Sequence, residues 1–186
     1  MLTEFKKYIE KHNLIEKDDK ILLALSGGVD SMVLAKLLLA VSRQLSANSQ
    51  LFFAHCNFHL RGEDSNRDER FVKEFAKENG IELFVKHFDT EAYAKEKSLS
   101  IEMAARELRY SWFEELKNIH NINKVALAHH GDDQIETFFI NFLRGSGIKG
   151  LKGMKAQNGF YIRPLLWSNR NQIETYAKEN GIQWVE

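Results

Sequence analysis

The turn after the first apolar run of the chain constrains the fold more than any other feature. Residues 20–25 (KILLAL) are almost continuously apolar, residues 26–31 read SGGVDS, and an apolar helical pattern follows. A run that is apolar on both faces is typical of a strand inside a parallel sheet with helices on both sides. The sequence therefore predicts a buried strand, a tight glycine-rich turn and a helix, which is the building unit of α/β folds.

The rest of the chain repeats this alternation of strand and helix. Further strands are predicted at residues 50–56, 81–88, 124–130 and 182–184, and helices at residues 31–45, 64–79, 100–116, 132–143 and 168–180. The hexapeptide AKENGI occurs twice, and both copies predict a helix end, a glycine cap and a strand start. We therefore predict an α/β domain with a doubly wound, five-stranded parallel sheet, in which ligands bind beyond the carboxyl ends of the strands.

Composition narrows the class of protein. The chain has 186 residues, of which 44% are hydrophobic and only one is proline, as in a globular domain. The single cysteine, Cys56, excludes a disulfide framework within the chain and fits a reducing compartment. The N-terminus has no apolar signal core, and no apolar run approaches the roughly 18–20 residues that span a bilayer. We therefore expect a cytoplasmic protein with no membrane partner.

The charges are balanced overall but unevenly distributed. The 26 basic and 26 acidic residues give a net charge of zero, which argues against a non-specific nucleic-acid binder. From residue 144 to residue 170, however, there is no Asp or Glu. The basic residues of this window are Arg144, Lys149, Lys152, Lys155, Arg163 and Arg170. The window predicts a contact with phosphate, and the alternative is a solvated loop.

The SGGVDS turn has the composition of a phosphate-binding loop. Glycines let backbone N–H groups converge on an anion, and the N-terminus of the following helix adds positive potential. The loop lacks the Gly-Lys-Ser/Thr ending of kinase and GTPase loops. A carboxylate at Asp30 would repel phosphate unless Mg²⁺ lies between them, so Asp30 is a candidate Mg²⁺ ligand, with simple helix capping as the alternative.

Polar residues follow two other predicted elements. In residues 54–72 (AHCNFHLRGEDSNRDERFV), His55 and Arg61 lie at the expected ligand edge, and His55 and His59 fit loop histidines better than metal ligands. In the helix from residue 100, Arg106 and Arg109 share an exposed face. These two arginines fit equally well a phosphate grip or ion pairs with a helical glutamate.

The densest cluster follows the fourth predicted strand. His129, His130, Asp132 and Asp133 open a helix whose apolar face carries Ile135, Phe138, Phe139, Phe142 and Leu143. No third His or Cys stands at zinc-ligand spacing, so assistance to Mg²⁺ or proton transfer is favoured over a zinc site. The glycine-rich stretch RGSGIKGLKG after the helix permits close approach to a partner.

Taken together, these blocks resemble the bacterial tRNA-isoleucine lysidine synthetases. SGGVDS is similar to the PP-loop of the wider N-type ATP pyrophosphatases, and IRPLL is among the stretches that match. HLRGEDS and the Arg-Gly-Ser-Gly, Gly-Leu, Gly-Met succession of residues 144–154 are more particular to lysidine synthetases. Three alternatives remain: a tRNA-thiolating enzyme, which usually carries a cysteine pair that is missing here; a small-molecule synthetase, which would not explain the acid-free window; and a non-enzymatic nucleotide-binding module.

The resemblance implies a reaction and a set of roles. ATP would adenylate the C2 oxygen of the wobble cytidine in the CAU anticodon of tRNA(Ile), and L-lysine would then displace AMP. The sheet order would be 3-2-1-4-5. Catalytic roles fall to Asp30, Arg106 and Asp133. ATP binding falls to Ser26, Gly27, Gly28, Val29, Asp30, Ser31, His55 and Arg61. The residues facing tRNA or lysine would be His129, Asp132, Arg144, Lys149 and Lys152.

The resemblance also bears on domain organisation. Members of this family usually continue with further domains that help to hold the tRNA, whereas this chain stops at QWVE, residues 183–186. We therefore expect residues 1–186 to form the nucleotide-binding catalytic domain alone. The sequence leaves the oligomeric state open, with a homodimer as one candidate.

Overall fold

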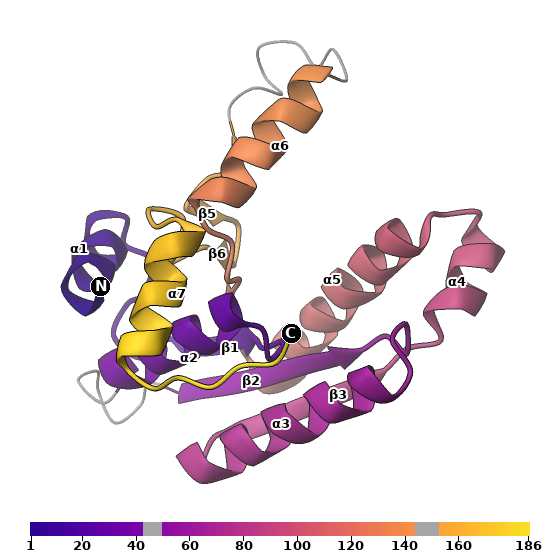
Figure 1. Ribbon diagram of the computed structural model, residues 1–186, viewed down its shortest axis with the longest axis horizontal. Coiled ribbons are helices and arrows are strands. Elements are labelled where there is room, and N and C mark those ends of the chain that lie inside the picture. Colours follow the sequence, from indigo (N-terminus) through magenta and orange to yellow (C-terminus); the bar gives the residue numbers. More distant parts are fainter. Residues whose placement is uncertain (43–49, 144–152) are drawn as a thin grey trace.

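A central sheet lies between two layers of helices (Figure 1). The computed structural model describes residues 1–42, 50–143 and 153–186, with only the backbone of residues 140–142. The strands are β1 (Lys20–Ala24), β2 (Gln50–Asn57), β3 (Glu82–His87), β4 (Lys124–Ala126), β5 (Gln157–Asn158) and β6 (Tyr161–Ile162). Their order is β3-β2-β1-β4-β6-β5, and all neighbours are parallel except β5, which pairs antiparallel with β6. The predicted α/β class and the order 3-2-1-4 are confirmed.

The helices begin and end largely where capping residues predict. They are α1 (Leu2–Lys11), α2 (Val29–Ser42), α3 (Glu63–Asn79), α4 (Thr90–Lys97), α5 (Ile101–His120), α6 (Gly131–Leu143) and α7 (Arg170–Glu179). The side chain of Ser100 accepts a hydrogen bond from Met103 N at the start of α5, as predicted. The prediction did not include α1 or α4. Asp89 caps α4 by accepting from Ala92 N.

Strand β1 shows why the sheet needs helices on both faces. Ile21 and Leu23 lie in a core with α1, α2, α3 and α7, whereas Leu22 lies in a second core with α5. Successive side chains of a strand point to opposite faces, so a continuously apolar strand requires cover on both sides. The doubly wound arrangement predicted from this run is therefore confirmed.

The predicted fifth strand at residues 182–184 is wrong. Residues 182–186 form no strand, because the backbone N–H of Val185 donates to Gly27 O at 3.0 Å instead of entering a sheet ladder. The place beside β4 is occupied by β6, which was not predicted. The second AKENGI copy therefore ends its helix near Gly181 as expected but is followed by an irregular segment, whereas the first copy leads into β3.

Helix α6 departs from the usual burial of an apolar helix face. It projects away from the body of the domain (Figure 1). Of the apolar residues that the periodicity placed on one face, those whose side chains the structure describes join neither core: Ile135 is 55% exposed, Phe139 56% and Leu143 82%. No helix in the described part of the chain is long and apolar enough to cross a membrane.

Candidate active site

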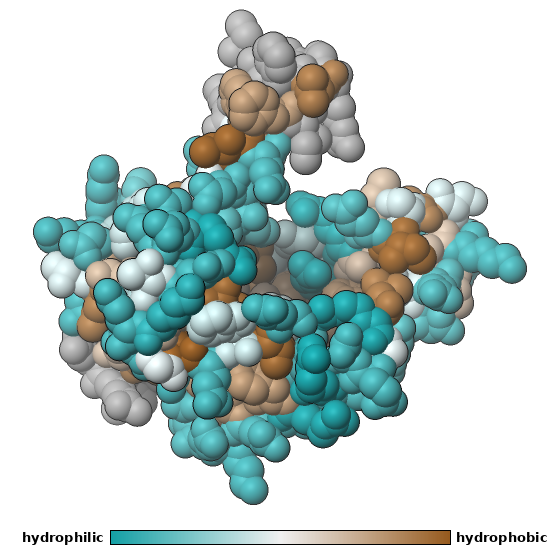
Figure 2. Space-filling model, in the orientation of Figure 1, coloured by the Kyte–Doolittle hydropathy of each residue, from teal (hydrophilic) through white to brown (hydrophobic). Residues whose placement is uncertain are grey.

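A cleft opens at the carboxyl ends of β1, β2 and β4. It encloses about 250 Å³. Its walls are Ala24 at the end of β1 with Leu25, Ser26, Asp30 and Ser31 beyond it, Ala54 and Cys56 from β2 with Phe58 just beyond it, Arg109, Tyr110 and Phe113 from α5, and Leu127, Ala128, His129 and Asp133 after β4. Figure 2 shows the molecule hollowed between the surfaces of α7 and α5. Motifs far apart in sequence therefore meet at the sheet edge where ligands were expected.

The loop after β1 is organised around the hydroxyl of Ser31. Ser31 Oγ accepts from Ser26 N (3.3 Å) and Gly27 N (3.2 Å), and it donates to Gly28 O (2.9 Å). Gly28 N donates to Ser26 Oγ at 3.3 Å. Three successive backbone N–H groups thus converge on neutral hydroxyls, which is the arrangement of an anion-binding nest. Val29, assigned to the same site, has its side chain buried in the core.

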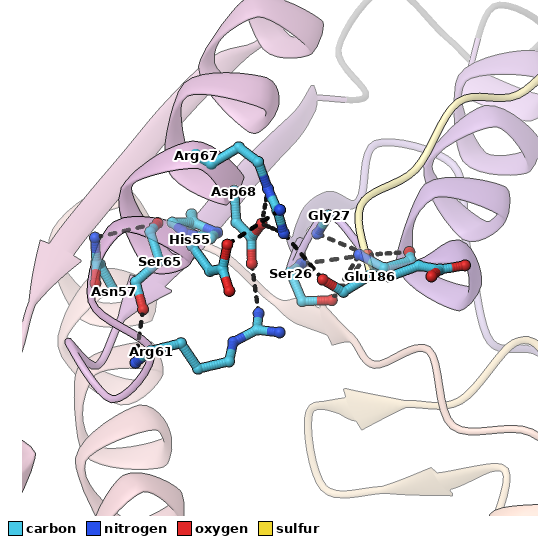
Figure 3. Close-up of polar contacts among 12 residues, drawn as sticks. Ser26, Gly27, His55, Asn57, Arg61, Ser65, Arg67, Asp68 and Glu186 are labelled. Carbon is cyan, nitrogen blue, oxygen red and sulfur yellow. Dashed lines mark hydrogen bonds and ion pairs between the residues drawn. The ribbon is translucent and has the colours of Figure 1, made fainter.

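Gly27 cannot be replaced without a change in its surroundings. Its φ is +94°, a conformation that side chains rarely adopt, and an added Cβ would lie 2.7 Å from Val185 Cγ2. The irregular segment 182–186 therefore lies directly on the loop (Figure 3). Arg67 Nη2 donates to Glu186 O at 3.0 Å, which ties the same segment to α3.

Asp30 is a partly buried carboxylate with one oxygen in an ion pair and the other without a hydrogen-bond partner among the described residues. Arg170 Nη1 contacts Asp30 Oδ2 at 2.8 Å, and His130 Nε2 lies 3.7 Å from Oδ1. Oδ1 is buried and has no hydrogen-bond partner. Burial raises the pKa of Asp30, and the positive charge of Arg170 opposes that rise. Sequence reasoning missed this role of Arg170 and counted it only as a basic residue of the window.

A reciprocal cap holds the start of α6. Asp132 N donates to His130 Nδ1 at 3.3 Å, and His130 N donates to Asp133 Oδ2 at 2.7 Å. This pattern satisfies N–H groups that a helix start leaves unpaired. Asp133 therefore both caps the helix and lines the cleft. Asp132 is turned away, since its Oδ2 accepts from Arg170 N at 2.8 Å and it is absent from the cleft wall.

His129 lies on the cleft wall and contacts a buried arginine, Arg163. Arg163 Nε donates to His129 Nδ1 at 3.3 Å, and Arg163 Nη1 donates to Lys155 O at 3.1 Å. Burial and the positive charge of Arg163 lower the pKa of His129 to about 4. The imidazole is therefore neutral near pH 7. Sequence reasoning placed Arg163 in the basic window, and nothing local to it indicated burial.

The two arginines of α5 have different places. The Arg109 guanidinium lies 5.4 Å from the centre of the Phe58 ring and lines the cleft. Arg106, which the resemblance marked as catalytic, is exposed and stacks 5.0 Å over the Tyr110 ring, at the rim. Neither forms an ion pair with a described carboxylate. A catalytic role for Arg106 stays a prediction, and Arg109 joins it as a candidate.

A second hollow of about 180 Å³ continues the cleft toward α3. Ser26, Cys56, Phe58 and Arg109 line both. His55 is buried here, and its Nδ1–H donates to Leu25 O at 2.9 Å, so it braces the end of β1. Burial lowers the pKa of His55. Arg61 forms a short ion pair with the buried carboxylate of Asp68, which Arg67 also contacts (Figure 3).

Of the remaining predicted residues, Cys56 lies in the cleft wall and the basic window is described only in part. Burial raises the pKa of the Cys56 thiol to about 12, so it is not a thiolate near pH 7. Arg144, Lys149 and Lys152 lie outside the described residues. Within the described part of the chain, no three His, Cys, Asp or Glu side chains are grouped to hold a metal ion.

Comparison with known proteins agrees with this geometry. A family model described as a PP-loop domain matches residues 1–186. Three curated proteins named tRNA(Ile)-lysidine synthase are similar: 50% identical over 179 residues in Bacteroides thetaiotaomicron, 44% over 185 in Parabacteroides distasonis and 39% over 183 in Clostridium acetobutylicum. These matches cover 96%, 100% and 98% of the chain but only 41%, 41% and 39% of the relatives. The chain thus spans about two fifths of their length.

Solved structures share the fold at low sequence identity. A U34-tRNA thiolase from Methanococcus maripaludis, determined with its [4Fe-4S] cluster, aligns with a TM-score of 0.80 at 20% identity, over 99% of this chain and 65% of its own. An NH3-dependent NAD synthetase from Campylobacter jejuni aligns with a TM-score of 0.63 at 17% identity, over 97% and 72%. At such identities the likeness establishes the fold alone.

Proposed function

Because the chain belongs to the PP-loop domain family, we propose that it is the nucleotide-binding catalytic domain of a tRNA(Ile)-lysidine synthase. The proposed reaction converts the wobble cytidine of the CAU anticodon to lysidine. The observation that carries the proposal is the meeting of the loop after β1 and the His129–Asp133 cluster in one cleft, in a chain 39–50% identical to proteins of that name.

The loop after β1 is the proposed site for the phosphates of ATP. Its N–H groups now bond to Ser26 Oγ and Ser31 Oγ, which are neutral acceptors. Hydrogen bonds to charged oxygens are roughly twice as strong as those between neutral groups, so a phosphate would displace the hydroxyls as partners. The two serine hydroxyls would then donate to the same phosphate.

The residues around Asp30 fit Mg²⁺. Asp30 Oδ1 is a buried oxygen without a partner, and Mg²⁺ is usually held by one or two carboxylates together with substrate phosphates. When bound, Mg²⁺ would supply positive charge to the polyphosphate. Arg170 would keep Asp30 Oδ2 in place from the other side.

Two successive displacement reactions would then take place in the cleft. In the first, the C2 oxygen of cytidine attacks the α-phosphorus, and the bond to pyrophosphate breaks. In the second, the ε-amine of lysine attacks C2, loses a proton, and the C2–O bond breaks to release AMP. We assign the lysine ammonium to Asp133, whose carboxylate would take the proton that the ammonium must lose before the amine attacks. The charge of the phosphates is assigned to Arg109, with Arg106 at the rim.

The proposed partners follow from this reaction. The tRNA would approach over α6 and the basic window, including Arg144, Lys149 and Lys152, because phosphate contacts need such charges. ATP, lysine and tRNA meet in the cytoplasm, where we place the protein. Light scattering would decide between a monomer and the candidate homodimer.

The test is direct detection of the product. The protein is incubated with ATP, Mg²⁺, lysine and a tRNA(Ile) transcript with the CAU anticodon, and the digested nucleosides are analysed by mass. A transcript with uridine at the wobble position is the matched control. We expect lysidine only from the first transcript and only with lysine present. Release of pyrophosphate without a modified nucleoside would contradict the proposal.

The thiolation alternative predicts a different dependence. The single cysteine of the chain has a raised pKa and lies in the cleft wall, where it would pack rather than react. A thiolated product formed with a sulfur donor, and abolished in Cys56→Ser, would favour that alternative over lysidine formation.

A further inference from the structure

Arg163 is a charged side chain in an unusual place. It is 8% exposed, it follows β6, and it forms no ion pair with any carboxylate among the described residues. Buried charges in proteins are normally paired, because removing them from water is costly. The hydrogen bonds that the structure assigns to its side chain go to Lys155 O and to a ring nitrogen of His129. A buried guanidinium that contacts an imidazole and no described carboxylate indicates that this contact has a specific role.

The chemistry of the two groups determines where the imidazole proton is. A guanidinium has donors only, so in the contact between Arg163 Nε and His129 Nδ1 the nitrogen of His129 must accept. A neutral imidazole carries one proton, and with Nδ1 accepting, that proton must be on Nε2. No described residue donates to or accepts from Nε2, and the ring lines the cleft.

The surroundings also keep the ring neutral. The positive charges of Arg163, Arg106 and Arg109 lower the pKa of His129. Among the charged groups that act on the ring most strongly, only the carboxylate of Asp133 raises that pKa. Burial works in the same direction as the arginines, since it disfavours the charged form. A doubly protonated ring would also lose the lone pair that accepts from Arg163.

We propose that Arg163 is a positioning residue, which holds His129 in the Nε2–H tautomer so that the ring offers a hydrogen-bond donor, and not a base, to the cleft. Arg163 itself touches no substrate in this arrangement. With the proposed function as its premise, the acceptor is an oxygen of the substrates, either a phosphate oxygen of the nucleotide or the carbonyl oxygen of the base.

Nuclear magnetic resonance of the protein labelled with ¹⁵N-histidine measures the tautomer directly, because protonated and unprotonated ring nitrogens resonate far apart. The chain has seven histidines, and His129→Gln identifies the signals of His129. We expect Nε2 protonated and Nδ1 bare near pH 7. Arg163→Met, which keeps the volume but has no donor, should give a mixture of tautomers and a pKa closer to 6.5.

Arg106→Met is the matched control. It removes a positive charge that acts on His129 but makes no hydrogen bond to the ring, so the tautomer should stay as in the wild type. A proton on Nδ1 in the wild type would overturn the proposal without any variant. An unchanged tautomer in a folded Arg163→Met protein would also overturn it, and the signals of His55 report whether the fold is kept.

Substrate titrations separate the two acceptors. If the acceptor is a phosphate oxygen, His129→Gln and Arg163→Met weaken ATP binding several-fold in the absence of RNA. If it is the base, ATP binding is unchanged and only turnover with tRNA falls. No effect on either would overturn the substrate part. The tautomer is measured without substrate. A failure to form lysidine would therefore contradict the proposed function without changing the result for the tautomer.

Discussion

The two loops that face each other across the cleft are built in opposite ways. After β1, the hydrogen bonds of residues 26–31 that shape the turn join partners two to five residues apart. After β4, a local cap joins His130, Asp132 and Asp133, but two further partners are remote: Arg163 binds His129 from 34 positions away, and Arg170 binds Asp132 from 38 positions away. The turn of the first loop is held mainly by hydrogen bonds between its own residues, whereas the second loop also depends on α7 and on the segment after β6.

Arg170 connects the two systems. Its guanidinium contacts Asp30, 140 positions away in the chain, and its backbone N–H contacts Asp132. The first loop therefore depends on remote residues at the Asp30 side chain and at Gly27 O, which accepts from Val185 N, while the hydrogen bonds of its turn are local. Substitutions should consequently damage the first loop through backbone strain and the second through lost partners.

The largest effect is expected at Gly27, where the local loop is least tolerant. Gly27→Ala should lower the free energy of unfolding by about 2–3 kcal/mol, because of its positive φ and the close approach of Val185. ATP affinity should fall with it. Chemical denaturation and calorimetric titration with ATP measure the two.

Gly28→Ala is the matched control, since the nearest atom to its added Cβ is Ser26 Oγ at 3.6 Å and its φ is not positive. The double variant Gly27→Ala/Val185→Ala should recover the steric part of the loss but not the part due to φ. Equal losses at Gly27 and Gly28 would show that the strain is not local to Gly27.

The next effect tests the connection between the loops. Arg170→Met removes the contacts with Asp30 and Glu174, and we expect a stability loss of about 1 kcal/mol, because the guanidinium is half exposed and solvent screens it. Mg²⁺-dependent ATP binding should fall more than ATP binding without Mg²⁺. Thermal melts with and without Mg²⁺–ATP measure both changes.

Lys178→Met on the same helix is the control for lost charge, because Lys178 forms no ion pair with the described residues. If both variants respond alike to Mg²⁺–ATP, Arg170 acts only through general charge, and the two loops are not coupled through it.

Lowering the pH should reduce the free energy of unfolding through His129 in the second loop, at a higher pH than the one at which carboxylates become protonated. Because the folded protein lowers the pKa of His129 from 6.5 to about 4, its contribution to stability is present above pH 6.5 and is lost as the pH falls toward 4. For a partly exposed ring we expect roughly 0.5–1 kcal/mol between pH 6.5 and 5.

His129→Gln should flatten this dependence without abolishing it, because burial also lowers the pKa of His55. Denaturant unfolding across pH 5 to 7.5 provides the measurement. A wild-type curve that is flat in this range would mean that His129 titrates alike in the folded and unfolded chains.

The smallest effect is expected at Cys56, which both hollows share. Cys56→Ser should keep the rate of lysidine formation within about twofold and cost no more than about 1 kcal/mol, since a half-buried neutral thiol is replaced by a smaller hydroxyl. The product assay and a thermal melt measure this, and a large loss of turnover in a stable protein would restore sulfur chemistry to consideration.

The local parts of the site were predictable. SGGVDS at the end of an apolar run indicated the turn after β1, Ser100 indicated the start of α5, and the polar clusters pointed to one edge of the sheet. The edge strand was not predictable in the same way. Residues 182–184 (IQW) begin like a strand after a helix end, but Val185 N bonds to Gly27 O, and the short segment Tyr161–Ile162 takes the place beside β4.

What the sequence by itself determined is therefore the doubly wound sheet, the phosphate-type loop and the set of polar residues at its edge, because spacing within a few residues defines backbone hydrogen bonds and apolar faces. Only the tertiary structure decided that Arg163 lies buried against His129, that Arg170 holds Asp30, and that Arg109 lines the cleft while Arg106 stays at the rim. The sequence does not distinguish an arginine in a basic loop from an arginine in a buried contact. The difference lies in which remote segment the packed chain brings to it, and that depends on the whole fold.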